Sequence, residues 1–303
     1  MMNQLTDEDT QLACLSSIRR HVNELMTDGF TIIPQSLPGD LCDEIREGFI
    51  RFSRLNSEIF IPNEDEYGHY GRIINLHLAY KPLIELFSRN CAALAVMDYL
   101  FGAETVIYTS LFYERGSAQA IHRDSPYFTT RPEYKYFGVW AALEDTDEGN
   151  GPLAVVKGGH LIPEFDREAM ARRYYDNLDK IDPASSQLWQ AYQDELGREC
   201  ARRGLTTETL CVKKGDTIIW HPQAPHGGAP IHDLRRTRFS FVMHTTPIGV
   251  PVYHQNVFFH LSKPVSDAAP WEYATRNGRR YAKFVEIGFM ERNRVYRVDD
   301  FHV

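Results

Sequence analysis

Hydrophobic and polar positions in the first third of the chain follow mainly helical spacing. This spacing predicts helices over residues 8–27, from about Asp40 to Phe52, and near 81–101. Between the first two helices, residues 30–33 read Phe-Thr-Ile-Ile and predict a short strand. We therefore expect a helical amino-terminal lobe that contains one strand.

From about residue 104 the pattern changes to short stretches rich in Val, Ile, Tyr, Phe and Trp, which predict strands separated by Gly-containing turns. The predicted strands are Val106–Glu114, Ala118–Asp124, Tyr134–Leu143, Pro152–Val156, Asp216–His221 and Arg238–Thr245. Strands thus lie on both sides of one charged stretch with helical character, residues 163–209. This order predicts one domain over residues 1–303, an antiparallel β-sandwich or barrel buttressed by the helices.

Two segments stand apart from the predicted barrel. The helical insertion at about 163–209 is expected to be either a lid or partner surface, or a solvated helical hairpin without a special role. The carboxyl-terminal extension, about 250–303, is aromatic and basic. We expect the extension to pack back on the barrel or to form a subunit contact, which would make the protein a homodimer.

Composition and charge narrow the classes of function. The 303 residues are 43% hydrophobic and carry a formal net charge of −8, which argues against nucleic acid or an acidic membrane surface as a partner. No apolar run reaches the roughly 18 residues of a membrane span, and the polar start of the chain lacks a secretion signal. Five cysteines without CxxC spacing are typical of reduced thiols, so we expect a cytoplasmic protein.

The first candidate for chemistry is the triplet His122-Arg123-Asp124. On an extended strand, residues i and i+2 point to the same face, so this imidazole and carboxylate would form two-thirds of a 2-His-1-carboxylate site for Fe(II). About one His-x-Asp triplet is expected by chance, so the triplet alone is weak. It also spells the catalytic tripeptide of protein kinases, but the chain lacks the other kinase motifs.

A second cluster, residues 220–228, supplies a candidate third ligand. It reads Trp-His-Pro-Gln-Ala-Pro-His-Gly-Gly, and His226 lies in its Pro/Gly-rich turn. His221 is the competing ligand, although its place beside a strand favours a supporting or core position. Downstream, Arg238 and Ser240 would share one strand face, where a guanidinium and a hydroxyl could receive a small dicarboxylate. The alternative interpretation of Arg238 is that it forms an ion pair on the surface and binds no dicarboxylate.

The order of these motifs resembles a known family. His122-x-Asp124 is followed by stretches at 138–145, 149–153, 157–160 and 214–216, and then by His226-Gly227-Gly228 and a trailing arginine. This series is similar to the phytanoyl-CoA dioxygenase family of Fe(II)- and 2-oxoglutarate-dependent oxygenases. The resemblance covers about residues 22–245 and implies a fold that is mainly β with helices: a double-stranded β-helix, or cupin-like jelly-roll, core buttressed by amino-terminal helices.

The resemblance also implies roles for individual residues. The iron ligands would be His122, Asp124 and His226, and the 2-oxoglutarate anchor would be Arg238 with help from Ser240. Arg236 is the alternative anchor, because the stretch after His226 departs from the family pattern. The implied activity uses O2 and 2-oxoglutarate to hydroxylate, or otherwise oxidise, a C–H bond of a small metabolite, with release of succinate and CO2.

Aromatic and basic residues near the iron motif are candidates for binding the substrate. They are Arg123, Tyr127, Arg131 and Trp140, which could line a pocket for a polar or anionic small molecule, although ordinary packing is the alternative. The competing function is a non-oxidative metal-dependent isomerase or hydrolase, or a metal-binding protein, on the same barrel. Arg238 separates the two hypotheses, because only the oxygenase requires an anchor for 2-oxoglutarate.

Overall fold

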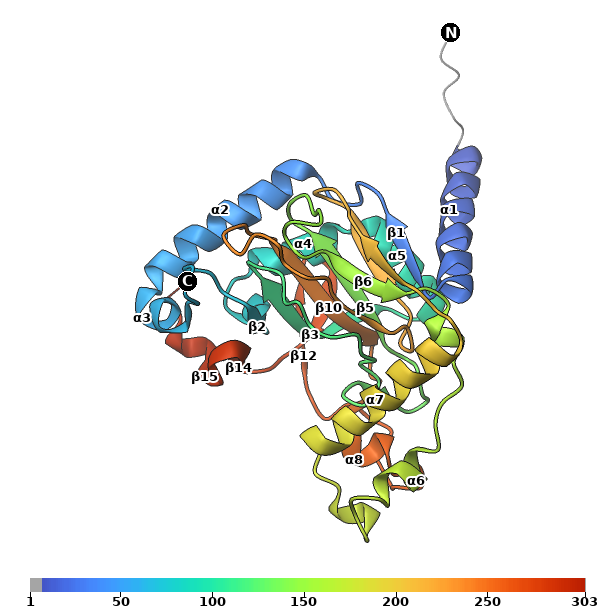
Figure 1. The fold of residues 1–303 in the computed structure, drawn as a ribbon. Helices are drawn as coiled ribbons and strands as arrows, with labels where there is room; N and C mark the ends of the chain where they lie inside the picture. The colour runs from blue at the N-terminus through green and yellow to red at the C-terminus, as the bar shows by residue number, and fades with distance from the viewer. Residues whose placement is uncertain (1–6, 303) are drawn as a thin grey trace.

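A computed structural model describes residues 7–302, with side chains from residue 13 onward. The polar first residues, where a secretion signal was sought, lie outside this range. The structure has three layers: helices, a large sheet, and a small sheet that faces the large one (Figure 1). Within residues 7–302, no helix combines the length and hydrophobicity needed to cross a membrane.

The large sheet is almost entirely antiparallel. Its main path runs in the spatial order β1 (Phe30–Ile33), β8 (Thr217–Trp220), β5 (Phe137–Ala142), β10 (Ser240–Pro247), β3 (Thr105–Tyr113), β2 (Arg72–Ile74), β14 (Glu286–Phe289) and β15 (Arg294–Arg297). The hairpin of β12 (Tyr273–Arg276) and β13 (Arg279–Ala282) joins β3 through one parallel bridge. The four central strands, β8, β5, β10 and β3, form the wall that carries much of the candidate site.

The small sheet contains β7 (Thr207–Leu210), β6 (Leu153–Val156) and β9 (His226–Gly228), all antiparallel. A separate pair joins β4 (Thr129–Thr130) to β11 (Val252–Tyr253). The two main sheets enclose one apolar layer that includes Trp140 and Trp220 from the large sheet and Val155 from the small one. This arrangement confirms the predicted jelly-roll core.

Side-chain alternation divides each central strand between two cores. On β5, Val139 and Ala141 face the helices, whereas Trp140 and Ala142 face the small sheet. On β10, Phe241 likewise faces the helices. A strand buried on both faces is expected to be largely apolar on both, and β5 accordingly reads as a continuous hydrophobic run, whereas β10 also buries polar residues such as His244.

Helices cover the outer face of the large sheet and form the insertion. They are α1 (Asp7–Thr27), α2 (Gly39–Leu55), α3 (Ser57–Phe60), α4 (Pro82–Arg89), α5 (Cys91–Phe101), α6 (Arg167–Ala171), α7 (Ser186–Arg202) and α8 (Gln255–Phe258). On α2, buried residues recur at helical spacing from Leu41 through Ile45 and Phe49 to Phe52. Phe49 packs on Phe112 of β3, with ring centroids 4.5 Å apart, and so joins this helix to the sheet.

The insertion and the carboxyl-terminal extension pack on each other below the barrel (Figure 1). Leu188 and Tyr192 of α7 share a buried cluster with Phe258 and Phe259 of the extension. The rest of the extension returns to the large sheet, where β14 pairs with β2. This pairing confirms that the extension packs back on the barrel.

Several predicted elements differ from the structure. Ala118–Asp124 is not a regular strand, because only His122 pairs, in an isolated bridge with His226, and the backbone turns at Asp124. The helix expected near 81–101 is two helices, since Asn90 ends α4 and caps α5. In the insertion, the helical residues are those of α6, of α7 and of a short 3₁₀ turn between them. The last residues of the insertion belong to β7.

The close contact between β5 and β8 gives a test of the packing. A Cβ atom on Gly138 would lie 2.0 Å from the ring of the buried Trp220, so Gly138→Ala should lower the free energy of unfolding by about 1–3 kcal/mol. Gly197 lies exposed in α7 with no atom within 4 Å of such a Cβ, so Gly197→Ala should raise it by up to about 1 kcal/mol. Urea unfolding followed by circular dichroism measures both changes. A Gly138→Ala variant as stable as the wild type would contradict the packing described here.

Candidate active site

Two histidines and one aspartate meet at the open end of the barrel. The backbones of His122 and His226 exchange hydrogen bonds of 2.8 and 2.9 Å, which hold the segment before Asp124 beside β9. Nε2 of His122 lies 3.3 Å from one carboxylate oxygen of Asp124, and Nε2 of His226 lies 3.3 Å from the other. One ligand atom from each residue falls within 4.8 Å of the other two, so the three could hold one metal ion.

The outer nitrogens of both imidazoles are held by the backbone. Nδ1 of His122 lies 2.7 Å from the carbonyl oxygen of Ala120, and Nδ1 of His226 lies 3.0 Å from that of Ala224. Each Nδ1 must carry the proton to donate to a carbonyl, which leaves a lone pair on Nε2 directed toward the other ligands. Metal-binding histidines commonly have this arrangement.

Asp124 is held in position by a tyrosine that the sequence reasoning missed. The hydroxyl of Tyr136 donates a 2.6 Å hydrogen bond to Oδ2 of Asp124. Burial alone would raise the pKa of this carboxyl group, but the imidazoles of His226 and His122 hold the pKa well below its ordinary value. The aspartate is therefore an anion aimed at the same point as the two histidines.

A second missed residue, His244, completes this polar group. It lies on β10, and its Nδ1 is 3.3 Å from the hydroxyl of Tyr136 and 4.0 Å from Oδ2 of Asp124. Burial lowers the pKa of His244 to about 4, so its imidazole is neutral at pH 7. Alternation could have identified it, since Ser240, Val242 and His244 follow at intervals of two along one strand.

The three residues open into a cavity of about 890 Å³ between the two sheets. This volume lies within the range of roughly 300–1,000 Å³ that is typical of small-molecule sites. Two of the predicted substrate residues, Tyr127 and Trp140, line the cavity. Trp189 of α7 and Phe284 beside β14 also line it, so the insertion and the extension both contribute walls. Their sequence positions gave no signal of this role.

Arg238 also faces the cavity and has no anionic partner among the described residues. It is 2% exposed, and its guanidinium lies over the rings of Tyr113 and Trp140 at 5.3 and 5.4 Å. Its Nε and the nearby Oγ of Ser240 are both buried without a hydrogen-bond partner. Burial lowers the pKa of Arg238 to about 10, which still leaves it charged at neutral pH. A buried, unpaired cation beside a free hydroxyl is a receptor for a carboxylate.

Arg238 and Ser240 are placed differently from the prediction, and of the two only Arg238 is among the residues that line the cavity. Strand β10 begins at Ser240, and Arg238 lies just before it, where its N–H donates to the carbonyl of Glu114 at 2.7 Å. The alternative anchor, Arg236, is instead paired with Asp147 on the surface, at 2.7 Å. His221, the alternative ligand, packs against His160 and does not line the cavity.

Two predicted substrate residues do not reach the cavity. The side chain of Arg123 points away from those of His122 and Asp124, and its guanidinium binds the backbone carbonyls of Gly159, Ile162 and Gln223. Alternation explains this placement, because residue i+1 faces opposite to i and i+2. This geometry corrects the expectation that Arg123 contacts substrate.

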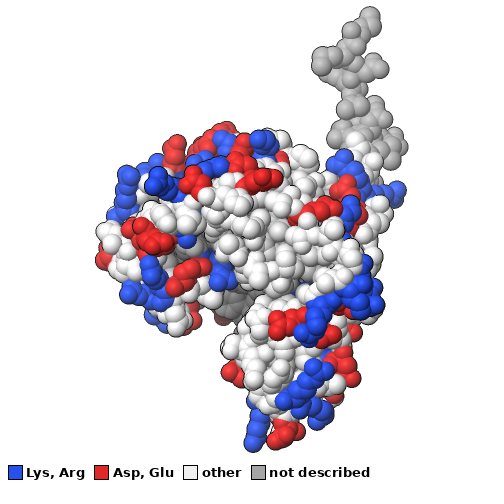
Figure 2. Space-filling view, viewed as in Figure 1, with Lys and Arg blue, Asp and Glu red and all other residues white. Residues whose placement is uncertain are grey.

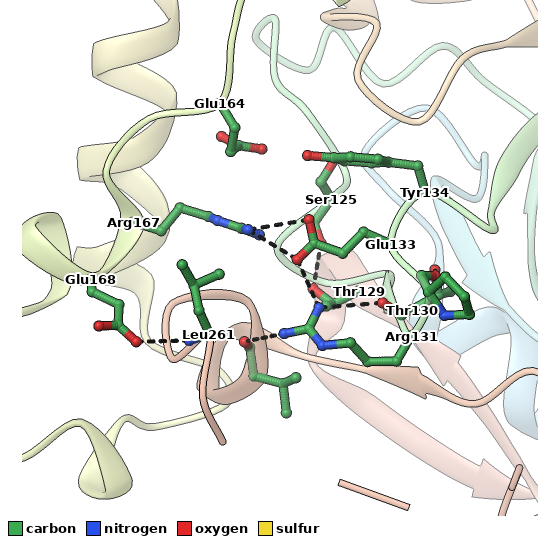
Figure 3. A network of polar contacts seen from close by, with 12 residues as sticks. Ser125, Thr129, Thr130, Arg131, Glu133, Tyr134, Glu164, Arg167, Glu168 and Leu261 are labelled. Carbon is green, nitrogen blue, oxygen red and sulfur yellow. Dashed lines mark hydrogen bonds and ion pairs between the residues drawn. The ribbon is translucent and has the colours of Figure 1, made fainter. Parts of the chain in front are cut away.

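Arg131 belongs to a polar network that attaches the insertion to the loop after Asp124 (Figure 3). Arg131 and Arg167 of α6 both bind the carboxylate of Glu133, at 2.8 and 2.9 Å. Arg131 also donates to the carbonyl of Val257 in α8. The expectation that Arg131 faces substrate is therefore corrected too, since its guanidinium joins three segments outside the cavity.

A jelly-roll whose open end places two imidazoles and a carboxylate in one cavity with a buried arginine defines a class: cupin-like proteins with a candidate facial triad. Comparison with known proteins gives the family. Residues 25–237 match the model of the family described as phytanoyl-CoA dioxygenase (PhyH). The match covers more than half of the chain, and the chain belongs to this family.

Curated relatives are distant in sequence. The chain is 24% identical over 189 residues to phytanoyl-CoA dioxygenase domain-containing protein 1 of Danio rerio, covering 61% of this chain and 59% of the relative. It is 23% identical over 224 residues to the peroxisomal phytanoyl-CoA dioxygenase of Rattus norvegicus, covering 66% and 60%. The chain thus spans about three fifths of the length of these relatives.

Solved structures share the fold. One is the epimerase SnoN in complex with Fe3+, alpha ketoglutarate and nogalamycin RO, with a TM-score of 0.58 and 17% identity over 88% of this chain and 99% of that one. Another is the non-heme alpha ketoglutarate-dependent carbocyclase SnoK, with a TM-score of 0.57 and 16% identity over 87% and 96%. At this level of identity the likeness confirms the fold.

The hydrogen bond from Tyr136 to Asp124 gives a test of the candidate metal site. Tyr136→Phe removes only the hydroxyl, and loss of such an outer contact commonly weakens metal binding about 10- to 100-fold. Isothermal titration with Mn²⁺ should show this loss. The matched control is Tyr134→Phe, whose hydroxyl contacts Gln223 outside the cavity and should leave the affinity unchanged. Equal weakening in both variants would contradict a specific role for Tyr136.

Proposed function

We propose that this protein is an Fe(II)- and 2-oxoglutarate-dependent oxygenase that uses O2 to oxidise a C–H bond of a small molecule, releasing succinate and CO2. One observation carries the proposal: the buried, unpaired Arg238 opens into the same cavity as His122, Asp124 and His226. Membership of the family and the ligands named in the SnoN structure support the same cofactors.

Each part of the site has a defined task in this proposal. His122, Asp124 and His226 would hold Fe(II), which suits two imidazoles and one carboxylate. Bound iron would supply the capacity to use O2 and 2-oxoglutarate for oxidation of a C–H bond. Arg238, with Ser240, would bind one carboxylate of 2-oxoglutarate through charge-assisted hydrogen bonds.

The protein itself orients the ligands and excludes water. The Tyr136 hydroxyl fixes the carboxylate of Asp124, while backbone carbonyls fix both imidazoles. The rings of Trp140 and Trp220 lie in the wall of the cavity and are each at most 2% exposed. Because a wall that excludes water lowers the local dielectric constant, it strengthens the electrostatic interaction between Arg238 and the carboxylate that it would bind.

The non-oxidative alternative is not favoured. A metal-dependent hydrolase or isomerase does not require an anchor for 2-oxoglutarate, whereas this cavity contains an unpaired arginine whose burial without a partner costs stability. The family match supports the oxygenase instead. Hydroxylation, desaturation and ring closure all stay open as outcomes of the oxidation.

We also propose the domain organisation, the cellular location and the partners that go with this activity. Residues 1–303 would act as one domain, because the insertion and the extension both line the cavity. The five cysteines are unpaired, which supports a reducing location such as the cytoplasm. Lys and Arg are interspersed with Asp and Glu on the face in Figure 2, which supports small molecules over nucleic acid as partners. We further propose that the protein forms a homodimer.

Binding of 2-oxoglutarate to the iron-loaded protein tests the proposal. Anaerobic wild-type protein with Fe(II) and 2-oxoglutarate should develop the visible charge-transfer band of the ternary complex, and His122→Ala should abolish it. Arg238→Ala removes charged hydrogen bonds worth roughly 1.5–3 kcal/mol, so the Kd for 2-oxoglutarate should rise about 10- to 150-fold.

The control for the anchor is Arg236→Ala, which breaks only a surface ion pair and should leave the titration unchanged. A wild-type protein that binds metal but gives no band with 2-oxoglutarate would refute the oxygenase assignment. A band that survives His122→Ala would refute the assignment of that ligand.

A further inference from the structure

The part of the cavity beyond the candidate metal ligands and Arg238 has mainly aromatic walls. One wall comes from β3 and the extension, and includes Tyr108 and Phe284, whose ring centroids are 5.6 Å apart. A second wall comes from the insertion and the loop after Asp124, and includes Trp189 and Tyr127, with centroids 4.6 Å apart. Figure 2 shows the surface indented between these two parts of the molecule.

These aromatic walls begin beside the candidate metal site. The ring of Trp189 lies 5.8 Å from the imidazole of His122. Phe128 stacks on His244, with centroids 4.2 Å apart and planes inclined by 19°. A flat apolar body placed between the walls would therefore lie next to the ligands, and stacking of aromatic faces contributes about 0.5–1.5 kcal/mol per pair beyond burial.

The same space offers almost no free positive charge. Arg238 and Arg72 are the Lys and Arg residues among the lining residues, and the first is assigned to 2-oxoglutarate. Arg72 is already engaged, because its guanidinium lies 3.2 Å from the carboxylate of Glu291 and donates to Gln119 at 3.2 Å. Glu286, which also lines the cavity, adds negative charge. A phosphate-rich substrate would enter without a partner for its charges, which is unfavourable.

Asn75 is one of the polar groups in this space that have a free hydrogen-bond donor. Asn75 lies in the left-handed region, with φ of 57°, and is 9% exposed. Its Oδ1 accepts from the hydroxyl of Thr109 at 2.7 Å and from the N–H of Ser110 at 3.2 Å. These two donors fix the orientation of the amide, and its NH2 group has no hydrogen-bond partner among residues 13–302 although Asn75 lines the cavity.

We propose that the substrate is an uncharged, ring-bearing molecule with an oxygen acceptor, stacked between the aromatic walls and hydrogen-bonded by Nδ2 of Asn75. This inference rests on the proposed oxygenase function and names its substrate class. It departs from the acyl-CoA in the names of the curated relatives, because a coenzyme A thioester carries several phosphate charges.

The test ranks defined probes on the anaerobic protein loaded with Fe(II) and 2-oxoglutarate. Isothermal titration is carried out with flavanone, estradiol and 2-naphthol, which are uncharged at pH 7, and with octanoyl-CoA. At least one of the three ring compounds should bind about tenfold or more tightly than octanoyl-CoA. Tighter binding of octanoyl-CoA, or no binding of any ring compound, would overturn the proposal.

Two variants test the contacts. Asn75→Asp keeps the acceptor for Thr109 and Ser110 but removes the donor, so the ring compound that binds best should lose about tenfold in affinity. The control is the same change at Asn177, which is exposed in the insertion and should have no effect. Unchanged affinity in Asn75→Asp would overturn the assigned hydrogen bond.

Trp189→Ala should weaken the same probe by a similar factor, and Trp189→Phe should restore most of the affinity because it keeps an aromatic face. Equal affinity in Trp189→Ala and the wild type would overturn the stacking. Failure of the oxygenase function is distinguishable: the charge-transfer band would then be missing from the wild type, while calorimetry would still rank the probes.

Discussion

The candidate site depends on one short piece of backbone pairing. His122 and His226 are far apart in sequence, and two reciprocal hydrogen bonds hold their backbones side by side. The side chain of Arg123 then ties this segment to three carbonyls on the other side, and Gln193 of α7 binds its backbone at 2.9 and 3.1 Å. With the segment fixed from both sides, the backbone contacts hold His122 and Asp124 at the candidate metal site.

The two buried charged groups of the site, Asp124 and Arg238, differ in whether they have partners. The carboxylate of Asp124 accepts a hydrogen bond from the Tyr136 hydroxyl, and Nε2 of each candidate histidine ligand lies 3.3 Å from one of its oxygens. Arg238 is also buried, but it lies over two aromatic rings and has no anionic partner among the described residues. A buried cation without a partner is unfavourable in the protein alone and becomes favourable when an anion binds. The site is therefore preorganised for a metal at one position and for a carboxylate at the other.

The cavity is completed by segments outside the jelly-roll. Helix α7 supplies Trp189, and the extension supplies Phe284 and Glu286. The family match ends at residue 237, so the extension lies beyond it. Because α8 packs on the insertion and β14 pairs with the large sheet, the extension holds both walls in place. The barrel thus carries the candidate chemistry, while the added segments shape the space for substrate.

The sequence by itself determined the layers of the fold and the set of candidate ligands. Alternation and turn signals are local properties, so the strands around Trp140, Trp220 and Ser240 could be predicted, as could the motifs of His122 and His226. Tertiary structure alone decided which residues share the cavity. Asn75, Trp189 and Phe284 come from separate segments, and no local spacing predicts that they line the same cavity. Nor could the sequence show that Arg238 lines the cavity whereas Arg123 and Arg131 do not, because burial and the choice of partner arise only when distant segments pack together.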